Sequence, residues 1–494
     1  MGPSPPDSLA QRTRAARGPA TDAFDGCPRQ ARGSAGIRRS ERVGDIVHRE
    51  TIRGLMSREV ERFVAEHARS GELFARGKRS LLAGVPMPWM TEWAGPYPVF
   101  VGEAEGARFT DVDGHTYVDF CLGDTGGMTG HAPKAAVQAI AERAAKGITL
   151  MLPTEDSIWV GEEMARRFGL PYWQFCLTAT DANRFTIRLA RAITGRPKIL
   201  VFNYCYHGSV DETIISIENG APGSRPGNIG PPVEPTETTR VVEFNDVAAL
   251  EEALAHEDVA CVLAEPALTN IGIVLPEQGF HDVLRELTRN HGTYLAIDET
   301  HCICAGPGGA TRAWGLEPDF LTIGKPLASG VPAACYGMTE EVARRSQAFM
   351  ESLPTTDVGG IGGTLSGNAL SLAAMRATLE HVLTGEAFER MIGLGERWAA
   401  GVKEAMTKHG LPWEVQRLGC RAEYWFTPTP PRTGGEAAAA DDHELAQLTH
   451  LYALNRGILL TPFHNMALMS PATTAEDVDR HTKVFGEMCA ELAG

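Results

Sequence analysis

Short apolar runs alternate with helical patterns through the middle of this 494-residue chain. Apolar runs of four or five residues are typical of strands that are buried inside a sheet. Strands that alternate with helices predict a mainly parallel sheet with helices on both faces. The apolar runs are residues 198–202, 260–264, 293–297 and 320–323, and a helical pattern at 134–145 precedes them.

Weaker strand patterns stand on both sides of this region. Residues 97–120 read as short strands broken by a turn, and residues 422–427 and 458–461 give two more strand patterns. The sequence therefore predicts two domains. A large α/β domain would comprise residues 131–370, and a small α+β domain would combine residues 46–130 with residues 371–494.

The first 45 residues differ in composition from the rest of the chain. They are rich in Arg, Pro, Gly, Ala and Ser and poor in large apolar side chains. Such a mixture buries too little surface to offset its ordering entropy, so we expect a disordered extension. Its basic bias resembles a transit peptide, and a later start at Met56 is an equally good interpretation.

Charge and cysteine usage exclude several classes of function. The formal net charge is −16, which argues against binding to nucleic acid or to an anionic membrane. No apolar run approaches the roughly 20 residues that a membrane helix needs. The ten cysteines are scattered and form no CxxC pair, which fits a reducing cytoplasm.

Two residues of opposite charge follow two of the apolar runs. Asp298 follows the run at 293–297, and Lys325 follows the run at 320–323. The carboxyl ends of parallel strands share one edge of a sheet, where ligands collect. Pyridoxal phosphate chemistry needs a lysine that condenses with the aldehyde and a carboxylate that keeps the pyridine nitrogen protonated. The ordinary alternative is that Asp298 caps a helix and Lys325 is solvated.

Tyr206 and Glu265 follow the other two apolar runs, so the same edge is expected to hold them. A flat aromatic ring is a suitable partner for a cofactor ring. Each residue also has an ordinary explanation, because Tyr206 could pack in the core and Glu265 could pair with a basic neighbour.

Two loops could hold a phosphate group. Residues 178–182 precede a helical stretch, whose free N–H groups and positive end favour an anion. The alternative for this loop is an ordinary helix cap. Thr364 lies in the Gly-rich segment 362–368, where glycines let the backbone approach a ligand closely.

Taken in order, these residues resemble the class III pyridoxal-phosphate-dependent aminotransferases, and most closely their glutamate-1-semialdehyde aminomutase-like members. The resemblance covers about residues 80–490. The stretches that carry it are residues 111–114, 117–120, 130–133, 188–192, 205–208, 264–266, 298–299, 324–325 and 363–368.

The resemblance implies the fold of the aspartate aminotransferase-like transferases. That fold has a large α/β domain with a mainly parallel seven-stranded sheet and a small α+β domain built from both ends of the chain. The resemblance also implies pyridoxal 5'-phosphate as cofactor and a homodimer with shared active sites. The cofactor-binding residues that it implies are Ala179, Thr180, Tyr206, Glu265, Asp298, Lys325 and Thr364.

The resemblance assigns a role to several of these residues. Lys325 would form the Schiff base and move protons, Asp298 would bind the pyridine nitrogen, and Tyr206 would stack on the ring. These three are the expected catalytic residues. Backbone N–H groups of the 178–182 loop would hold the phosphate, and Thr364 would reach the phosphate of the neighbouring subunit.

The chain departs from the family pattern at two places near the expected cofactor. Residues 178–182 read Thr-Ala-Thr-Asp-Ala where the family has Ser-Gly-Thr-Glu-Ala, a change that keeps the N–H donors. Thr300 replaces a valine, and His301, Cys302 and Cys304 follow it. These three side chains lack a fourth ligand, so no metal site is expected.

The substrate side shows a third departure. Met90 stands where the resemblance implies an arginine for the substrate carboxylate, and with Trp89 it predicts a wall for a bulky apolar group. Arg421 and Arg456 are candidates for a guanidinium that binds a keto acid. Each could instead be a structural ion-pair partner. His464 is expected to line the pocket.

From these residues and the resemblance we expect a cytoplasmic aminotransferase (transaminase). It would move an amino group from a bulky amine or β-amino acid to a keto acid such as pyruvate or 2-oxoglutarate. The main alternative is an intramolecular aminomutase of the glutamate-1-semialdehyde type, which needs no external keto acid. A non-catalytic relative and a sugar aminotransferase are further alternatives.

Overall fold

The computed structural model describes residues 47–355 and 359–494. The predicted disordered extension, residues 1–45, lies outside the described residues. Contacts gather the described residues into one unit. The predicted domain boundaries at residues 130 and 370 within that unit stay predictions. No helix among the described residues is long and apolar enough to cross a membrane.

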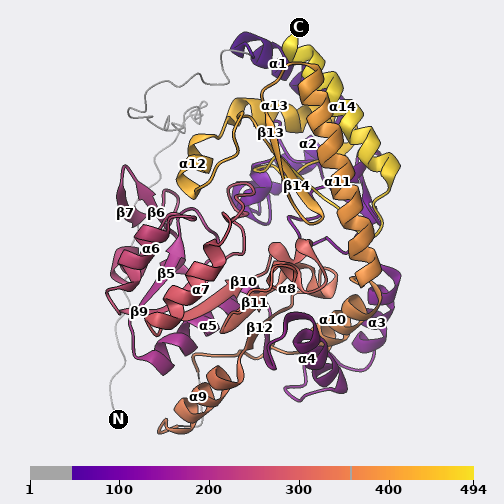
Figure 1. Ribbon diagram of the computed structural model, residues 1–494. Helices are drawn as coiled ribbons and strands as arrows, with labels where there is room; N and C mark the ends of the chain where they lie inside the picture. The colour runs from indigo at the N-terminus through magenta and orange to yellow at the C-terminus, as the bar shows by residue number, and fades with distance from the viewer. Residues whose placement is uncertain (1–46, 356–358) are drawn as a thin grey trace, which may run out of the picture. The chain divides into compact units, whose positions relative to one another are not determined.

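The predicted mainly parallel sheet is present and has seven strands in the order β4-β12-β11-β10-β9-β5-β8 (Figure 1). Only β12 runs against its neighbours. Every residue of β9 and β10 is buried, as expected for central strands of a parallel sheet. The strands are β4 (Tyr172–Cys176), β5 (Lys198–Phe202), β8 (Thr239–Val242), β9 (Val259–Ala264), β10 (Tyr294–Asp298), β11 (Phe320–Ile323) and β12 (Ala334–Met338).

Helices connect these strands and pack against them. Helix α5 lies along β9, β11 and β12, while α7 packs on β10 and α6 packs on β8. A two-stranded sheet of β6 (Ile215–Glu218) and β7 (Ala221–Ser224) extends from the same region. The helices are α3 (Lys134–Ala144), α4 (Glu155–Phe168), α5 (Ala179–Thr194), α6 (Val247–Leu254), α7 (Phe280–Asn290), α8 (Gly309–Ala313), α9 (Glu340–Glu351) and α10 (Ala369–His381).

Segments from both ends of the chain form two smaller sheets. The sheet β1-β2-β3-β15 pairs Ile458 with Val118 in parallel, and the sheet β13-β14-β16 packs against α11. These strands cover the patterns predicted at 97–120, 422–427 and 458–461. They are β1 (Val101–Glu105), β2 (Arg108–Asp111), β3 (Thr116–Asp119), β13 (Glu414–Leu418), β14 (Arg421–Trp425), β15 (Ile458–Leu459) and β16 (Met466–Leu468).

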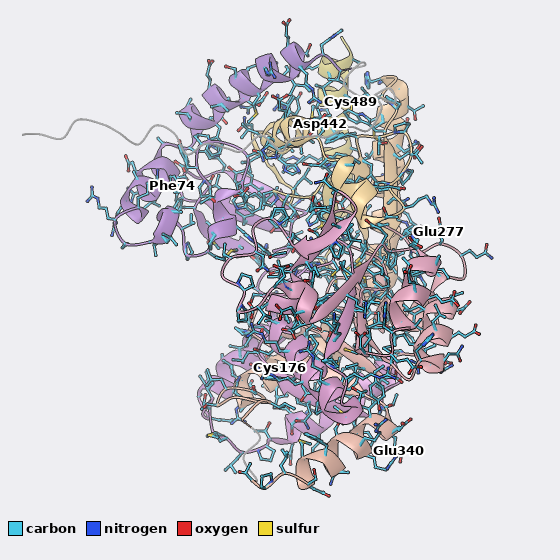
Figure 2. All side chains as sticks on the ribbon, turned by 90° about the vertical axis from the view of Figure 1, so that its left-hand side faces the viewer. Phe74, Cys176, Glu277, Glu340, Asp442 and Cys489 are labelled. Atoms are coloured by element: carbon cyan, nitrogen blue, oxygen red, sulfur yellow. The ribbon has the colours of Figure 1, made fainter. Side chains whose placement is uncertain are left out.

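Long helices cover these smaller sheets. Helix α1 packs against α13, and α11 packs against α14. Figure 2 shows Asp442 and Cys489, from this part, at one end of the view and Cys176 and Glu340, from the large sheet and its helices, towards the other. The helices are α1 (Arg49–Glu66), α2 (Ala68–Gly77), α11 (Gly385–Lys408), α12 (Gly434–Ala439), α13 (His443–Leu454) and α14 (Ala475–Ala493).

Single turns of 3₁₀-helix connect several of these elements. Two of them, η6 and η7, follow β10 and β11 at the carboxyl edge of the large sheet. The turns are η2 (Leu82–Gly84), η3 (Pro88–Thr91), η4 (Asp211–Thr213), η5 (Pro235–Glu237), η6 (Cys302–Ala305) and η7 (Lys325–Ala328).

Candidate active site

The carboxyl edge of the seven-stranded sheet brings together the predicted acid and the predicted lysine. Asp298 is the last residue of β10, and Lys325 is the first residue of η7, just after β11. Both side chains line one cavity of about 430 Å³. Lys325 has a φ of 53°. This left-handed conformation costs energy for a residue other than glycine, and such strain concentrates at functional sites.

Other predicted residues line the same cavity, while Thr364 does not. Thr364 is exposed in the segment before α10. Its expected contact with a neighbouring subunit stays a prediction. The predicted residues on the cavity wall besides Asp298 and Lys325 are Trp89, Ala179, Thr180, Tyr206 and Glu265.

The predicted phosphate loop is the start of α5. Thr178 caps this helix and exchanges hydrogen bonds with Asp181, so both the predicted cap and the predicted set of free N–H groups are present. The backbone of Gly208 packs closely against Thr180 at the start of this helix, and Gly208 has a φ of 81°. A Cβ atom at Gly208 would lie 2.1 Å from Thr180 Oγ1, so only glycine fits at this position.

Three hydrogen-bond donors surround the buried carboxylate of Asp298. His207 Nδ1 lies 2.9 Å from Asp298 Oδ2, and Asn183 Nδ2 donates to the same oxygen at 2.8 Å. The Thr300 N–H donates to Oδ1 at 3.0 Å. Sequence reasoning missed Asn183 and gave His207 no catalytic role. Asn183 lies one helical turn beyond Ala179, and this spacing was the only signal for it.

These contacts keep Asp298 ionised. Burial by itself would raise the pKa of Asp298, but the hydrogen bond and positive charge of His207 outweigh burial and lower the pKa to about 2. Burial would likewise lower the pKa of His207, and its neighbours Cys205 and Asp298 raise that pKa well above its ordinary value. The pair is therefore an anion and a cation, buried side by side.

Lys325 has two partners that the sequence did not predict. Its Nζ atom donates to Asp124 Oδ2 at 3.0 Å and lies 2.5 Å from His301 Nε2. Asp124 belongs to the loop after β3. Burial would raise the pKa of Asp124, but the positive charge of Lys325 holds that pKa far below its ordinary value.

Glu265 is buried beside the Asp298 carboxylate. Burial raises the pKa of Glu265 to about 7, against the lowering effects of His207 and of a hydrogen bond from the Thr269 hydroxyl. The Oε1 atom of Glu265 has no hydrogen-bond partner among the described residues. Glu265 is thus poised between its neutral and charged forms near neutral pH.

A second cavity of about 640 Å³ meets the first at Lys325, and its wall is largely apolar. The predicted wall residues Trp89 and Met90 both line it. The Trp89 ring lies 5.6 Å from the Tyr206 ring and 5.5 Å from the Phe463 ring, measured between centroids. Trp89 therefore links the wall of the second cavity to the predicted ring partner in the first.

Arg421 and His464, two predicted substrate residues, do not line either cavity. The Arg421 side chain is completely buried, donates to the Thr269 carbonyl at 2.9 Å and pairs with Glu423 at 3.4 Å. His464 Nδ1 lies 3.3 Å from Glu423 on the other side of that carboxylate. The three side chains form a buried network that reaches His301 through Arg421.

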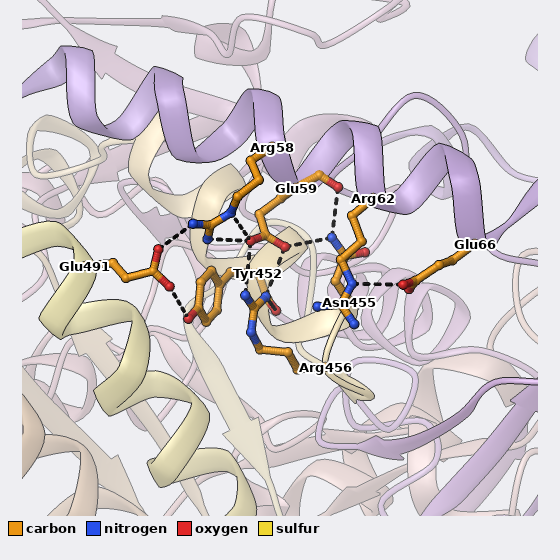
Figure 3. Close-up of polar contacts among 8 residues, drawn as sticks. All are labelled: Arg58, Glu59, Arg62, Glu66, Tyr452, Asn455, Arg456 and Glu491. Carbon is orange, nitrogen blue, oxygen red and sulfur yellow. Dashed lines mark hydrogen bonds and ion pairs between the residues drawn. The ribbon is translucent and has the colours of Figure 1, made fainter.

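Arg456 also lies away from both cavities. Its guanidinium pairs with the buried carboxylate of Glu59 at 3.0 Å and lies over the Tyr452 ring (Figure 3). Asn455 donates to the same Glu59 carboxylate. The network joins α1 to the loop after α13, which is the structural role that the sequence left open for this arginine.

Cys302 and Cys304 do not line the cavity that Lys325 lines. Their thiols donate to the Ala267 and Leu418 carbonyls, respectively, while His301 contacts Lys325. They form no candidate metal cluster in the described part of the chain.

Comparisons with known proteins place this geometry in a family. The family model described as Aminotransferase class-III matches residues 89–486. The chain belongs to the class III aminotransferases. Its fold is the pyridoxal-phosphate-dependent fold of this family, and its cofactor is pyridoxal 5'-phosphate. The residues present suit that cofactor, because an anion, a lysine and a close-fitting helix start line one cavity.

Several relatives carry a narrower name. A glutamate-1-semialdehyde 2,1-aminomutase of Sorangium cellulosum is 35% identical over 421 residues, which cover 83% of this chain and 94% of the relative. The solved structure of a glutamate-1-semialdehyde-aminomutase from Pseudomonas aeruginosa PAO1 is 50% identical, with a TM-score of 0.88, over 90% of this chain and 100% of that one. A lysine-to-alanine variant of the Pseudomonas protein is solved in complex with PMP.

A more distant solved structure is a transaminase. The omega-transaminase from Sphaerobacter thermophilus is 28% identical, with a TM-score of 0.77, over 86% of this chain and 98% of that chain. The relatives of higher identity, however, are named aminomutases.

The predicted transfer of an amino group from a bulky amine or β-amino acid to a keto acid is therefore wrong. That prediction rested on the apolar wall at Met90, whereas the relatives of higher identity are named aminomutases.

Proposed function

We propose that this chain is an intramolecular aminomutase of the glutamate-1-semialdehyde type. Such an enzyme exchanges an amino group and a carbonyl oxygen between two carbons of one substrate. The observation that carries the proposal is the match to proteins named glutamate-1-semialdehyde aminomutases, which extends over 83% and 90% of this chain. Asp298 and Lys325, on one cavity wall, supply the two charges that such chemistry needs.

The bound cofactor supplies an electron sink next to the amino nitrogen. We assign the N–H groups of Ala179 and Thr180 to its phosphate, because they start a helix and line the cavity. Asp298 suits the pyridine nitrogen because its pKa of about 2 keeps it anionic at neutral pH. Tyr206, on the same wall, provides a flat ring against the cofactor.

Lys325 is the group that moves protons. Its neutral amine takes a proton from a substrate carbon, and the ammonium then gives a proton to the neighbouring carbon. In an aminomutase the same amine serves both carbons, since the amino group leaves one and arrives at the other. The place of Nζ between the two cavities suits this double task.

The walls of the two cavities offer little to bind a carboxylate. Among the described residues that line them, Lys325 is the only lysine or arginine. Proteins favour guanidinium groups for a carboxylate, whether it belongs to a keto acid or to glutamate-1-semialdehyde itself. Met90 cannot pair with a carboxylate, so this wall does not decide between the two reactions.

A homodimer is part of the proposal. Thr364 and its neighbour Leu365 are exposed in this chain. In a homodimer with shared sites, Thr364 would bind the phosphate held by the partner subunit. Light scattering should give twice the chain mass, and Thr364→Ala should weaken cofactor binding about tenfold, the loss of roughly one hydrogen bond to a charged group.

The test of the function contains one substrate and no keto acid. The purified enzyme with cofactor is incubated with glutamate-1-semialdehyde alone, and mass spectrometry after chromatography follows the isomer in which the amino and carbonyl positions are exchanged. We expect turnover without added keto acid, and none in Lys325→Ala. Turnover that requires a keto acid, with formation of the corresponding amino acid, would refute the proposal.

A further inference from the structure

The amine of Lys325 rests between an acid and an imidazole that come from two different loops. Asp124 lines the larger, apolar cavity, and His301 lines the smaller one. Lys325 lines both, and its side chain is 27% exposed. His301 Nε2 also lies 3.8 Å from Asp124 Oδ2, so the amine, the acid and the imidazole form one compact cluster.

The loop that carries Asp124 is held in a costly conformation. Leu122, Asp124 and Thr125 have φ angles of 45°, 51° and 80°, and Gly123 between them has a φ of 56°. The left-handed region is unfavourable for side chains with a Cβ atom, most of all for a β-branched residue such as Thr125. The four successive residues with positive φ direct the Asp124 carboxylate at Lys325 and the Thr125 hydroxyl at His301.

Asp124 is the only acidic side chain on the wall of the apolar cavity, among the described residues. Its Oδ2 atom contacts Lys325, while its Oδ1 atom is buried without a hydrogen-bond partner. A carboxylate in such surroundings is costly unless a cation faces it. The protonated amine of Lys325 is the cation that this position favours.

His301 offers the opposite property. Burial, together with the charge of Lys325, lowers the pKa of His301 well below its ordinary value, so the imidazole is neutral. A neutral imidazole carries one N–H group and one lone pair. Its Nδ1 atom lies 3.0 Å from the Thr125 hydroxyl and 3.4 Å from Arg421 Nη1.

The neutral imidazole can match either state of the lysine. When Lys325 is an ammonium, it donates to Nε2, and the Nδ1–H group donates to the Thr125 oxygen. When Lys325 is a neutral amine, the Nε2–H group donates to the nitrogen lone pair, and Nδ1 accepts from the Thr125 hydroxyl or from Arg421. Only the tautomer of His301 changes between the two arrangements.

We propose that Asp124 and His301 hold the Lys325 amine in both of its protonation states, so that one lysine can act as base and then as acid on the same substrate. Asp124 favours the ammonium, and His301 accommodates both forms. In the base step the proton moves from a carbon to the Nζ lone pair, and the C–H electron pair stays on the substrate. In the acid step a proton returns to the neighbouring carbon, so Lys325 ends as it began.

Other titratable and charged groups surround Asp124, Lys325 and His301. Arg421 from β14 and His464 from the loop after β15 face Asp124 from behind, and both lower its pKa. Tyr206 faces it from the loop after β5, and its pKa is raised by burial and by the charge of Asp124. Asp298 and Glu265 line the cavity of Lys325 and His301. These groups remain in place in the variants below, so the changes report on Asp124 and His301.

The first test uses the visible absorbance band of the bound cofactor. The band persists while the nitrogen that the cofactor shares with Lys325 carries a proton. Removing a negative charge in direct contact should lower the midpoint of its pH titration by about one unit or more in Asp124→Asn. Asp124→Glu, which keeps the charge, should stay closer to the parent.

A matched control removes a carboxylate elsewhere. Asp258 pairs with Arg240 at 2.7 Å at the edge of the large sheet, and Asp258→Asn should titrate like the parent enzyme. An unchanged midpoint in Asp124→Asn, or an equal shift in Asp258→Asn, would overturn the role of Asp124. If Asp124→Asn does not fold, Asp124→Ser takes its place in the same titration.

The second test compares two replacements of His301. Gln offers both a donor and an acceptor, while Leu offers neither. We expect His301→Leu to lower kcat about a hundredfold, with little change in KM and with a larger isotope effect for substrate deuterated at the reacting carbon. His301→Gln should recover part of the loss. Equal losses in both variants without a change in the isotope effect would overturn the role of His301.

The two tests separate this inference from the proposed function on which its second step rests. The titration needs no substrate, so it reports on Asp124 even if glutamate-1-semialdehyde is not converted. A shifted titration without isomerisation would refute the proposed function alone. Isomerisation with an unshifted titration would refute the role of Asp124 alone.

Discussion

His207 Nδ1 lies 2.9 Å from Asp298 Oδ2, and both side chains are buried. Asp298 accepts that hydrogen bond and carries the compensating charge, so each group keeps the other ionised. The donor is essential to this state, because burial alone would favour a neutral carboxyl group.

Replacing His207 by Leu should therefore raise the pKa of Asp298 from about 2. A depressed carboxyl pKa keeps the carboxylate charged down to low pH, and that benefit is lost as the pH falls through the raised pKa. The acidic limb of the kcat profile should move to higher pH. His409→Leu, in the C-terminal cap of α11, is the control. A profile in His207→Leu that overlays the parent would contradict this prediction.

Glu265→Gln should change the pH dependence of stability. Burial raises the pKa of Glu265 from 4.5 to about 7. A raised pKa contributes stability below pH 4.5 that is lost as the pH rises through 7. Relative to the parent, the Gln variant should gain up to roughly 3 kcal/mol on going from acidic to basic pH.

Thermal unfolding of cofactor-free enzyme, at pH values below and above the raised pKa of Glu265, measures this gain. Glu277 pairs with Arg432 in exposed surroundings, so Glu277→Gln should show no comparable gain. A pH-independent difference between Glu265→Gln and the parent would count against the raised pKa.

Gly208→Ala should weaken cofactor binding. The added Cβ would meet Thr180 Oγ1 at 2.1 Å, so the start of α5 would have to move. We expect the cofactor Kd to rise about tenfold or more, by analogy with the loss of a charged hydrogen bond. Gly220 has a similar φ of 79° but open space around it, so Gly220→Ala carries the backbone strain without the clash. Fluorescence titration with cofactor compares the two variants, and equal Kd values would rule out the clash.

Arg421→Met should destabilise the protein because it leaves Glu423 buried without its arginine. Loss of one partner from a buried pair costs about 3 kcal/mol or more. Arg432→Met, at an exposed pair, should cost much less because solvent screens that pair. Denaturant unfolding of both variants gives the comparison. An equally small cost at Arg421 would mean that the buried network adds nothing to stability.

Met90→Arg should improve the use of an acidic substrate. Met90 lines the apolar cavity that Lys325 also lines, so an arginine there could pair with a carboxylate. We expect the KM for glutamate-1-semialdehyde to fall about tenfold, the effect of one charge-assisted hydrogen bond. Leu82→Arg places the same charge at a highly exposed position and should leave KM unchanged. An unchanged KM in Met90→Arg would show that this wall does not contact the substrate end.

The long apolar runs allowed the central strands to be predicted, while three strands of the large sheet were missed. Strand β12 reads Ala-Cys-Tyr-Gly-Met, and its Gly337 has the Trp173 ring where a Cβ would stand. Glycine is unfavourable in strands unless a neighbour needs its space. That requirement comes from tertiary packing, which local sequence does not contain. β4 and β8 contain polar residues, and neither strand forms an unbroken apolar run that would predict it from the sequence.

Some residues of the candidate site could likewise be predicted from the sequence, and others could not. Asp298 and Lys325 could be predicted because strand ends converge at one edge of a parallel sheet. Asp124 could not, since it comes from a loop of the small sheet whose approach depends on packing between distant segments. Arg421 was predicted from its residue type alone, and its burial behind the site depends on Glu423.

The parallel pairing of Ile458 with Val118 has a consequence for the order in which this enzyme matures. Asp124 follows one of these paired strands and Phe463 follows the other, and both belong to the wall around Lys325. A ribosome releases the second strand only after every strand of the large sheet, because β15 follows all of them in the chain. The growing polypeptide can assemble its large sheet first, and the chamber closes only after β15 and the loop that follows it have been released.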